Sequence, residues 1–79
     1  MNSVIFPNPV NDRLTVEIPK NEKGDYMISI IDLNGKILMK ENYTQVGEIE
    51  INTTSLKNSF YIIEIEFENK TYRQKFIKK

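Results

Sequence analysis

The fold is decided by one stretch of the chain, residues 26–43, which reads YMISIIDLNGKILMKENY. Two apolar runs of strand length flank the dipeptide Asn34-Gly35, and Asn-Gly between such runs is the strongest short-range signal of a β-hairpin. Both central residues of a type I′ turn need positive φ, which asparagine and glycine tolerate best. The stretch therefore predicts a tight hairpin with a type I′ turn at Asn34 and Gly35, which we expect to support the fold.

Outside this hairpin, apolar and polar residues alternate with period two along most of the chain. The three-to-four spacing of an amphipathic helix is absent over any useful length. The expected strands are residues 3–6, 13–18, 26–32, 36–43, 48–52, 60–67 and 71–78. Short strands with frequent turns predict an all-β fold, a seven-stranded antiparallel immunoglobulin-like β-sandwich.

The segment Pro7-Asn8-Pro9 interrupts this pattern after the first strand. Its two prolines fix two φ angles and remove two backbone donors, so the first strand must end or cross over there. We expect Pro7, Asn8 and Pro9 to support the fold in this way. Because such a hinge is stiff and edge strands pair readily, a homodimer through edge strands stays open.

The last two strands can be aligned as a hairpin that turns at residues 69–70. This alignment sets Glu66 opposite Arg73 and Glu64 opposite Lys75 on one face, and mostly apolar residues on the other. We expect that register, with the apolar face toward the core and the charged face outside.

Length and charge limit the classes of function. The 79 residues make one domain, and we expect the sandwich to span residues 3–79, with residues 1–2 as an expression boundary cut into a longer protein. Eleven basic and 11 acidic side chains give a net charge of zero, so no long-range field attracts nucleic acid or an anionic membrane. The apolar stretches are strand-sized, and we expect no membrane insertion.

Side chains that carry chemistry are scarce. The chain has no histidine and no cysteine, which removes the commonest general base, metal ligand and strong nucleophile. Glu64 and Glu66 are spaced two apart on an expected strand, so they share one solvated face. Asp32, Asn34 and the Gly35 carbonyl are oxygen ligands in one loop, but a turn explains these residue types better. We therefore expect no enzymatic activity, no cofactor and no metal.

The end of the chain is the exception to the balance of charge. The last ten residues carry five basic side chains and no acidic one: Lys70, Arg73, Lys75, Lys78 and Lys79. Charged side chains on an edge strand protect it from aggregation, and this role explains Arg73 and Lys75. They leave the ending Lys78-Lys79 unexplained.

Three segments, in this order, resemble the type A family of C-terminal sorting domains of the type IX secretion system, with which Bacteroidetes export hydrolases, adhesins and virulence factors. Residues 6–16 (FPNPVNDRLTV) resemble the opening of the family, an aromatic residue before Pro-Asn-Pro and then an alternating strand. Residues 32–36 resemble its central hairpin, and residues 56–63 and 75–78 resemble its last two strands with their basic residues. The family usually has glycine where this chain has Ser59.

The resemblance implies a non-catalytic signal domain, fused in cis to a cargo protein that passes through the periplasm. The type IX translocon would carry the cargo across the outer membrane, and a sortase-like peptidase would then usually cleave the domain off. The cargo would end secreted or at the cell surface. We expect the recognised terminal element to be Lys75, Phe76, Ile77, Lys78 and Lys79.

Other classes of function share this fold class. A carbohydrate-binding or adhesive accessory module predicts an exposed aromatic platform or a cation site. A structural spacer domain predicts no requirement for the terminal residues. Four tyrosines without a tryptophan are a poor basis for a sugar platform, and a small enzyme is the least favoured alternative.

Overall fold

The structure, a computed structural model, describes residues 4–6, 9–18, 24–44 and 47–79. The strands are β1 (Val4–Phe6), β2 (Arg13–Ile18), β3 (Tyr26–Asp32), β4 (Ile37–Tyr43), β5 (Gly47–Asn52), β6 (Ser59–Phe67) and β7 (Lys70–Lys78). No helix in this part of the chain is long and apolar enough to cross a membrane. The all-β class predicted from the alternation is confirmed.

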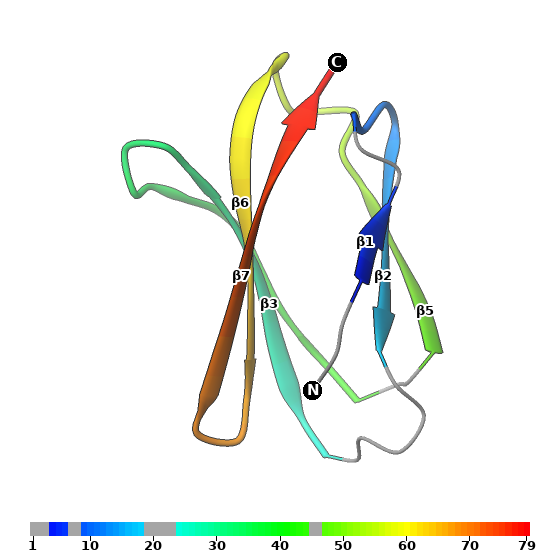
Figure 1. The fold of residues 1–79 in the computed structure, drawn as a ribbon, viewed down its shortest axis with the longest axis vertical. Coiled ribbons are helices and arrows are strands. Elements are labelled where there is room, and N and C mark those ends of the chain that lie inside the picture. The colour runs from blue at the N-terminus through cyan, green and yellow to red at the C-terminus, as the bar shows by residue number, and fades with distance from the viewer. Residues whose placement is uncertain (1–3, 7–8, 19–23, 45–46) are drawn as a thin grey trace.

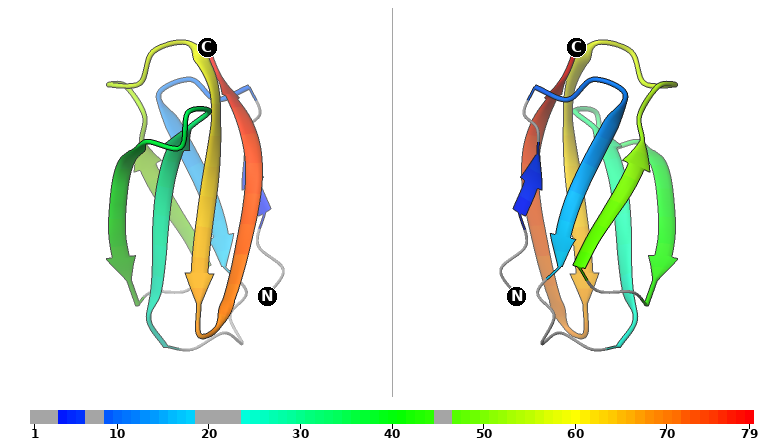
Figure 2. Two further views of the ribbon diagram at one scale, coloured as in Figure 1. Left: turned by 90° about the vertical axis from the view of Figure 1, so that its left-hand side faces the viewer. Right: turned by 90° about the vertical axis from the view of Figure 1, so that its right-hand side faces the viewer.

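The strands form two antiparallel sheets that pack face to face (Figure 1). One sheet has the order β1-β2-β5, and the other has the order β4-β3-β6-β7. Figure 2 shows the four-stranded sheet in front in its left view and the three-stranded sheet in front in its right view. Each strand pair is antiparallel, as a chain of short strands and tight turns favours.

The core lies between the sheets and contains every second residue of the central strands. From the three-stranded sheet it takes Leu14, Val16, Ile18, Ile49 and Ile51. From the four-stranded sheet it takes Tyr26, Ile28, Ile30, Tyr61, Ile63, Ile65, Phe67 and Phe76. Each fully buried aliphatic or aromatic side chain contributes about 1.5–3 kcal/mol, so these alternating residues hold the two layers together.

β4 is the least covered strand, and it forms one edge of the four-stranded sheet. Met39 and Tyr43 pack against the core, whereas most other residues of β4 are exposed. In Figure 1 the tip of the β3–β4 hairpin projects away from the three-stranded sheet. The inner side of this tip is therefore not covered by the opposite layer.

The β3–β4 hairpin forms where Asn34-Gly35 predicts it, but the predicted type I′ turn is wrong. The loop has three residues, Leu33 to Gly35, because the Asp32 N–H donates to the Lys36 carbonyl (3.0 Å) and the Gly35 N–H donates to the Asp32 carbonyl (3.0 Å). Gly35 has φ +88°, and Asn34 has no positive φ. The Asp32 carboxylate accepts the N–H groups of Asn34 and Lys36 (2.9 Å each), which favours this longer loop.

The register predicted for the last hairpin is wrong by two residues. β6 and β7 turn at Glu68 and Asn69, not at Asn69-Lys70, and Glu64 faces Arg73 instead of Lys75. Glu68 takes φ 56°, the sign that the first central residue of a type II′ turn requires. Because side chains alternate with period two, a shift of two residues keeps the predicted inner and outer faces.

Of the proline segment, Pro7 and Asn8 lie outside the described residues, and Pro9 is exposed in a bend. β1 ends at Phe6, before the first proline, as expected. Ser59, where the family usually has glycine, begins β6 without positive φ, so this position does not need glycine here.

Candidate functional site

The terminal element of the chain, residues 75–79, consists of the end of β7 and Lys79, which follows it, and its side chains alternate between two environments. Phe76 is 0% exposed and Lys78 is 7% exposed, so both face the interior. Lys75 and Lys79 are exposed, and Ile77 is half-buried on the outer side. The five residues expected to act together are therefore divided by the period of the strand.

Phe76 is part of the core. Its ring stacks on Tyr61 with 5.7 Å between the ring centroids and 30° between the planes. The Tyr61 hydroxyl donates to the Lys57 carbonyl at 2.7 Å, which fixes the ring on which Phe76 packs. A partner on the outside of the sheet cannot contact Phe76.

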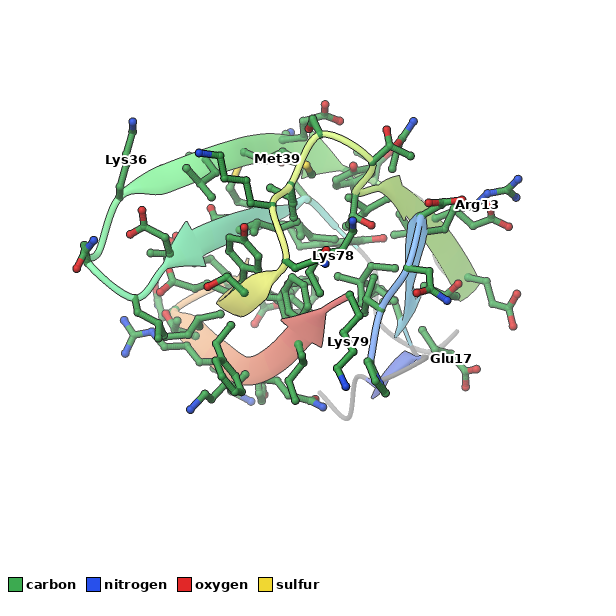
Figure 3. All side chains as sticks on the ribbon, turned by 90° about the horizontal axis from the view of Figure 1, so that it is seen from above. Arg13, Glu17, Lys36, Met39, Lys78 and Lys79 are labelled. Atoms are coloured by element: carbon green, nitrogen blue, oxygen red, sulfur yellow. The ribbon has the colours of Figure 1, made fainter. Side chains whose placement is uncertain are left out.

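Lys78 is the unusual residue of the element, because its charged side chain is buried. Its ammonium group donates to the Leu56 carbonyl at 3.3 Å. Figure 3 shows the side chains of Lys78 and Lys79 on opposite sides of the strand, with Lys79 pointing outward. A buried charge needs a hydrogen-bond partner, and here the partner belongs to the segment that leads from β5 into β6. Lys78 thus connects the end of β7 to that segment.

The backbone of the element also joins the two sheets through Val10. The Val10 N–H donates to the Ile77 carbonyl (2.7 Å), and the Lys79 N–H donates to the Val10 carbonyl (2.8 Å), in a parallel bridge. Val10 is fully buried and directly precedes the turn into β2. Since β7 belongs to the four-stranded sheet and β2 to the three-stranded sheet, this bridge closes one side of the sandwich.

A third set of hydrogen bonds ties the turn before β2 to the end of β5. The Thr53 N–H donates to the Asp12 carbonyl (2.8 Å), and the Thr53 hydroxyl donates to the Asn11 carbonyl (2.8 Å). Thr53 is fully buried, and its N–H and its hydroxyl are thereby paired. At this end of the sandwich, hydrogen bonds therefore link residues 10–12 to the end of the chain and to Thr53, which follows β5.

The outer side of the element presents two cations and apolar surface. The Lys75 ammonium lies 4.6 Å from the centroid of the Phe60 ring, a cation–π contact. Phe60 is 43% exposed and lies opposite Ile77 in the β6–β7 pairing. Lys75 and Lys79 therefore flank a surface formed by Phe60 and Ile77. Such a surface suits carboxylates and apolar groups of another protein.

Phe60 and Val10 are residues that the sequence analysis did not single out. Phe60 could have been found from its place opposite the terminal element once the correct register is used. Val10 carries no comparable signal, because the bridge depends on how the two layers meet. Asn34 and Gly35 lie in the β3–β4 turn and not in the terminal element.

The remaining chemistry of the described residues is limited. They contain no group of three or more acidic, histidine or cysteine side chains that could hold a metal ion. Burial and the hydrogen bond to Glu41 (3.1 Å) raise the pKa of Tyr43 to about 12, and burial raises the pKa of Tyr26. Neither change moves a group toward neutral pH, where a general acid or base is most effective.

Comparison with known proteins identifies the family. The model of the secretion system C-terminal sorting domain matches residues 4–79, which is nearly the whole chain and includes the terminal element. A search of curated proteins finds no match. The two-layered β-structure and the basic terminal strand agree with the assignment. The chain therefore belongs to the C-terminal sorting domains of the type IX secretion system.

Proposed function

We propose that the type IX machinery recognises this domain in its folded state, through the outer side of the end of β7. The side chains that would contact the machinery are Lys75, Ile77 and Lys79. The observation that carries the proposal is the alternation of residues 75–79, in which Phe76 and Lys78 face the interior. In this proposal the two inward residues hold the strand, and the three outward residues are presented to the partner.

The family supplies the setting of this contact. A domain of this kind is a non-catalytic C-terminal signal that directs a cargo protein, fused to it in cis, to the type IX secretion machinery. The cargo is exported across the outer membrane and is secreted or reaches the cell surface. Export systems of this kind are typical of Bacteroidetes.

Four finer features belong to the proposal. The two-sheet fold is of the seven-stranded immunoglobulin-like class, and the domain has no enzymatic activity of its own. The cargo passes through the periplasm, and a sortase-like peptidase then removes the domain by cutting on the upstream side of β1.

Export of a reporter tests the proposal. A fluorescent protein with an inner-membrane export signal and residues 3–79 at its C-terminus is expressed in a type IX-competent strain and in a translocon-deficient strain. The reporter should leave only the competent cells. Lys75→Glu with Lys79→Glu should retain it in the periplasm, because both cations are reversed.

Lys70→Glu is the matched control, since Lys70 is an exposed lysine at the other end of the same strand. It should export like the unchanged domain. Normal export of the Lys75→Glu, Lys79→Glu variant would overturn the proposed recognition face. Equal retention of the unchanged reporter in both strains would show that residues 3–79 are not a sufficient signal.

A further inference from the structure

A hollow beside Phe60 separates the β3–β4 hairpin from the segment that leads into β6. Its lining includes Leu33, Lys36, Leu38, Leu56, Lys57 and Phe60. Its volume is about 700 Å³, which is large enough for a bulky side chain together with neighbouring backbone. In Figure 1 the tip of the hairpin projects away from the three-stranded sheet, so the opposite layer does not cover it.

Among the residues whose burial the structure describes, three of the four large apolar side chains that are exposed line the hollow. Leu33 is 57% exposed, Phe60 43% and Leu38 39%. Leu56 packs against the core from the same hollow. An isolated exposed leucine is ordinary, but several around one concave surface mark an interaction site.

Charge indicates the chemistry of the occupant. Lys36 and Lys57 line the hollow, and Lys75 lies over the ring of Phe60. The acidic residue in the lining is Asp32, whose carboxylate already accepts two backbone N–H groups of the turn at 2.9 Å. Two lysines in the lining, with a third over the Phe60 ring, suit a partner whose carboxylates surround a large apolar side chain.

We infer that this hollow binds an acidic segment of a protein of the export machinery. A large apolar side chain of the segment packs among Leu33, Leu38 and Phe60, and its carboxylates meet Lys36 and Lys57. The inference rests on the proposed function, because Phe60 contacts Lys75 and faces Ile77 of the terminal element. One partner surface can therefore cover the terminal element and the hollow together.

Two variants of the hollow test the inference in the reporter assay. Leu38→Ser removes an apolar contact, and Lys36→Glu with Lys57→Glu reverses the charge; all three residues are exposed, so the fold should remain. Export should fall about tenfold or more for each variant, as expected when central contacts of an interface are lost. Lys40→Glu is the control, an exposed lysine of β4 outside the hollow. It should export normally.

A photo-crosslinking residue at position 38 provides an independent measurement. It should form a crosslink to a translocon component in competent cells, and Lys36→Glu with Lys57→Glu should abolish that crosslink. The same residue at position 17, on the outer side of the other sheet and far from Lys36 in Figure 3, should form none. Each purified variant should have the same melting temperature as the unchanged domain, which would show that its fold is retained.

The outcomes separate this inference from the proposed function. If the hollow variants export normally while Lys75→Glu with Lys79→Glu does not, the inference is wrong and the terminal recognition face stands. Loss of export from the hollow variants alone supports the hollow and overturns the terminal face. If light scattering shows a dimer that Leu38→Ser abolishes, the occupant is a second copy of the chain, and the acidic partner is wrong.

Discussion

Lys78 is a charged residue of the terminal element that serves the fold from the inside. Its alkyl chain is buried. In the part of the chain that the structure describes, its ammonium group donates a hydrogen bond to the Leu56 carbonyl. A methionine side chain is similar in length to the alkyl part of lysine and does not carry the cost of a buried charge. Lys78→Met should therefore change the free energy of unfolding by less than about 1 kcal/mol, whereas Lys78→Ala should lose about 1–3 kcal/mol.

Urea denaturation of both variants measures this difference, and the export assay adds a second readout. Lys78→Met should export normally. If Lys78→Met keeps its stability but fails to export, the ammonium group itself is recognised, and the inward residue has a role beyond the fold.

Gly35 is the residue on which the β3–β4 turn depends most directly. Its φ is +88°, and an added Cβ would meet no atom within 4 Å, so backbone strain is the whole effect of a substitution. Gly35→Ala should destabilise the domain by about 1–2 kcal/mol, and Gly35→Asn by less, because asparagine tolerates this region better. Equilibrium urea unfolding gives both values. Equal stability of all three forms would mean that the loop changes its conformation.

Tyr43 makes the stability depend on pH in the alkaline range. Burial, together with its hydrogen bond to Glu41, raises its pKa in the folded protein to about 12, from 10.0 for a free tyrosine. Above pH 10.0 the unfolded chain loses this proton while the folded chain keeps it. The stabilisation is therefore complete below pH 10.0 and is lost as the pH rises through about 12.

Tyr43→Phe should reduce this alkaline loss, measured as the difference in urea midpoint between about pH 9 and about pH 11. Part of the loss should persist, because burial also raises the pKa of Tyr26, on which Tyr43 stacks at 6.2 Å. An unchanged difference would mean that Tyr43 titrates like an exposed tyrosine.

The pairing of β6 with β7 is tested by a double-mutant cycle. Glu64 and Arg73 lie opposite each other, with a 2.7 Å ion pair, and their side chains are 14% and 67% exposed. Substitution of both by alanine, singly and together, should give a coupling energy of about 0.2–1 kcal/mol. The cycle of Glu66 with Arg73, the pair expected from the sequence register, should give a smaller value. A larger coupling energy for Glu66 with Arg73 than for Glu64 with Arg73 would support the register predicted from the sequence and contradict the pairing in the structure.

Most of the strand pattern could be predicted because alternation is a local property. Residues 13–18 and 26–32 are strands with the bounds that the sequence predicts. The two turns could not be predicted in detail. Asp32 favours a three-residue loop through its carboxylate, and a shift of two residues leaves the faces of β6 and β7 unchanged. Local patterns therefore determine the faces of the strands better than their register.

The candidate site was predictable in position but not in detail. The basic residues indicate the end of β7, yet their sequence does not reveal that Lys78 is buried or that Val10 bridges to this strand. Both features depend on contacts between segments far apart in the chain. The same is true of the hollow, whose lining comes from the β3–β4 hairpin and from the segment before β6.

At the scale of the whole molecule, β7 is needed to complete the core. A domain of this size buries only about 60% of the surface that its unfolded chain exposes, so its margin of stability is small. Phe76 is fully buried against Tyr61, and the Val10 bridge joins the last residues to the other sheet. Removal of residues 75–79 would therefore damage the fold as well as the recognised surface, and its effect on export could not be assigned to either.

Phe76→Ala separates these two effects, because it leaves Lys75, Ile77 and Lys79 in the chain. Loss of the ring should cost about 3–5 kcal/mol, a large part of the about 5–15 kcal/mol that holds a typical domain folded. The variant should unfold at a lower urea concentration, and reporter export should fall in parallel because the outward side chains are no longer held on one strand. Phe76→Leu should lose less stability and less export than Phe76→Ala. If Phe76→Ala is largely unfolded and still exports, the machinery recognises the terminal residues as a linear sequence, and the alternation of β7 has no role in recognition.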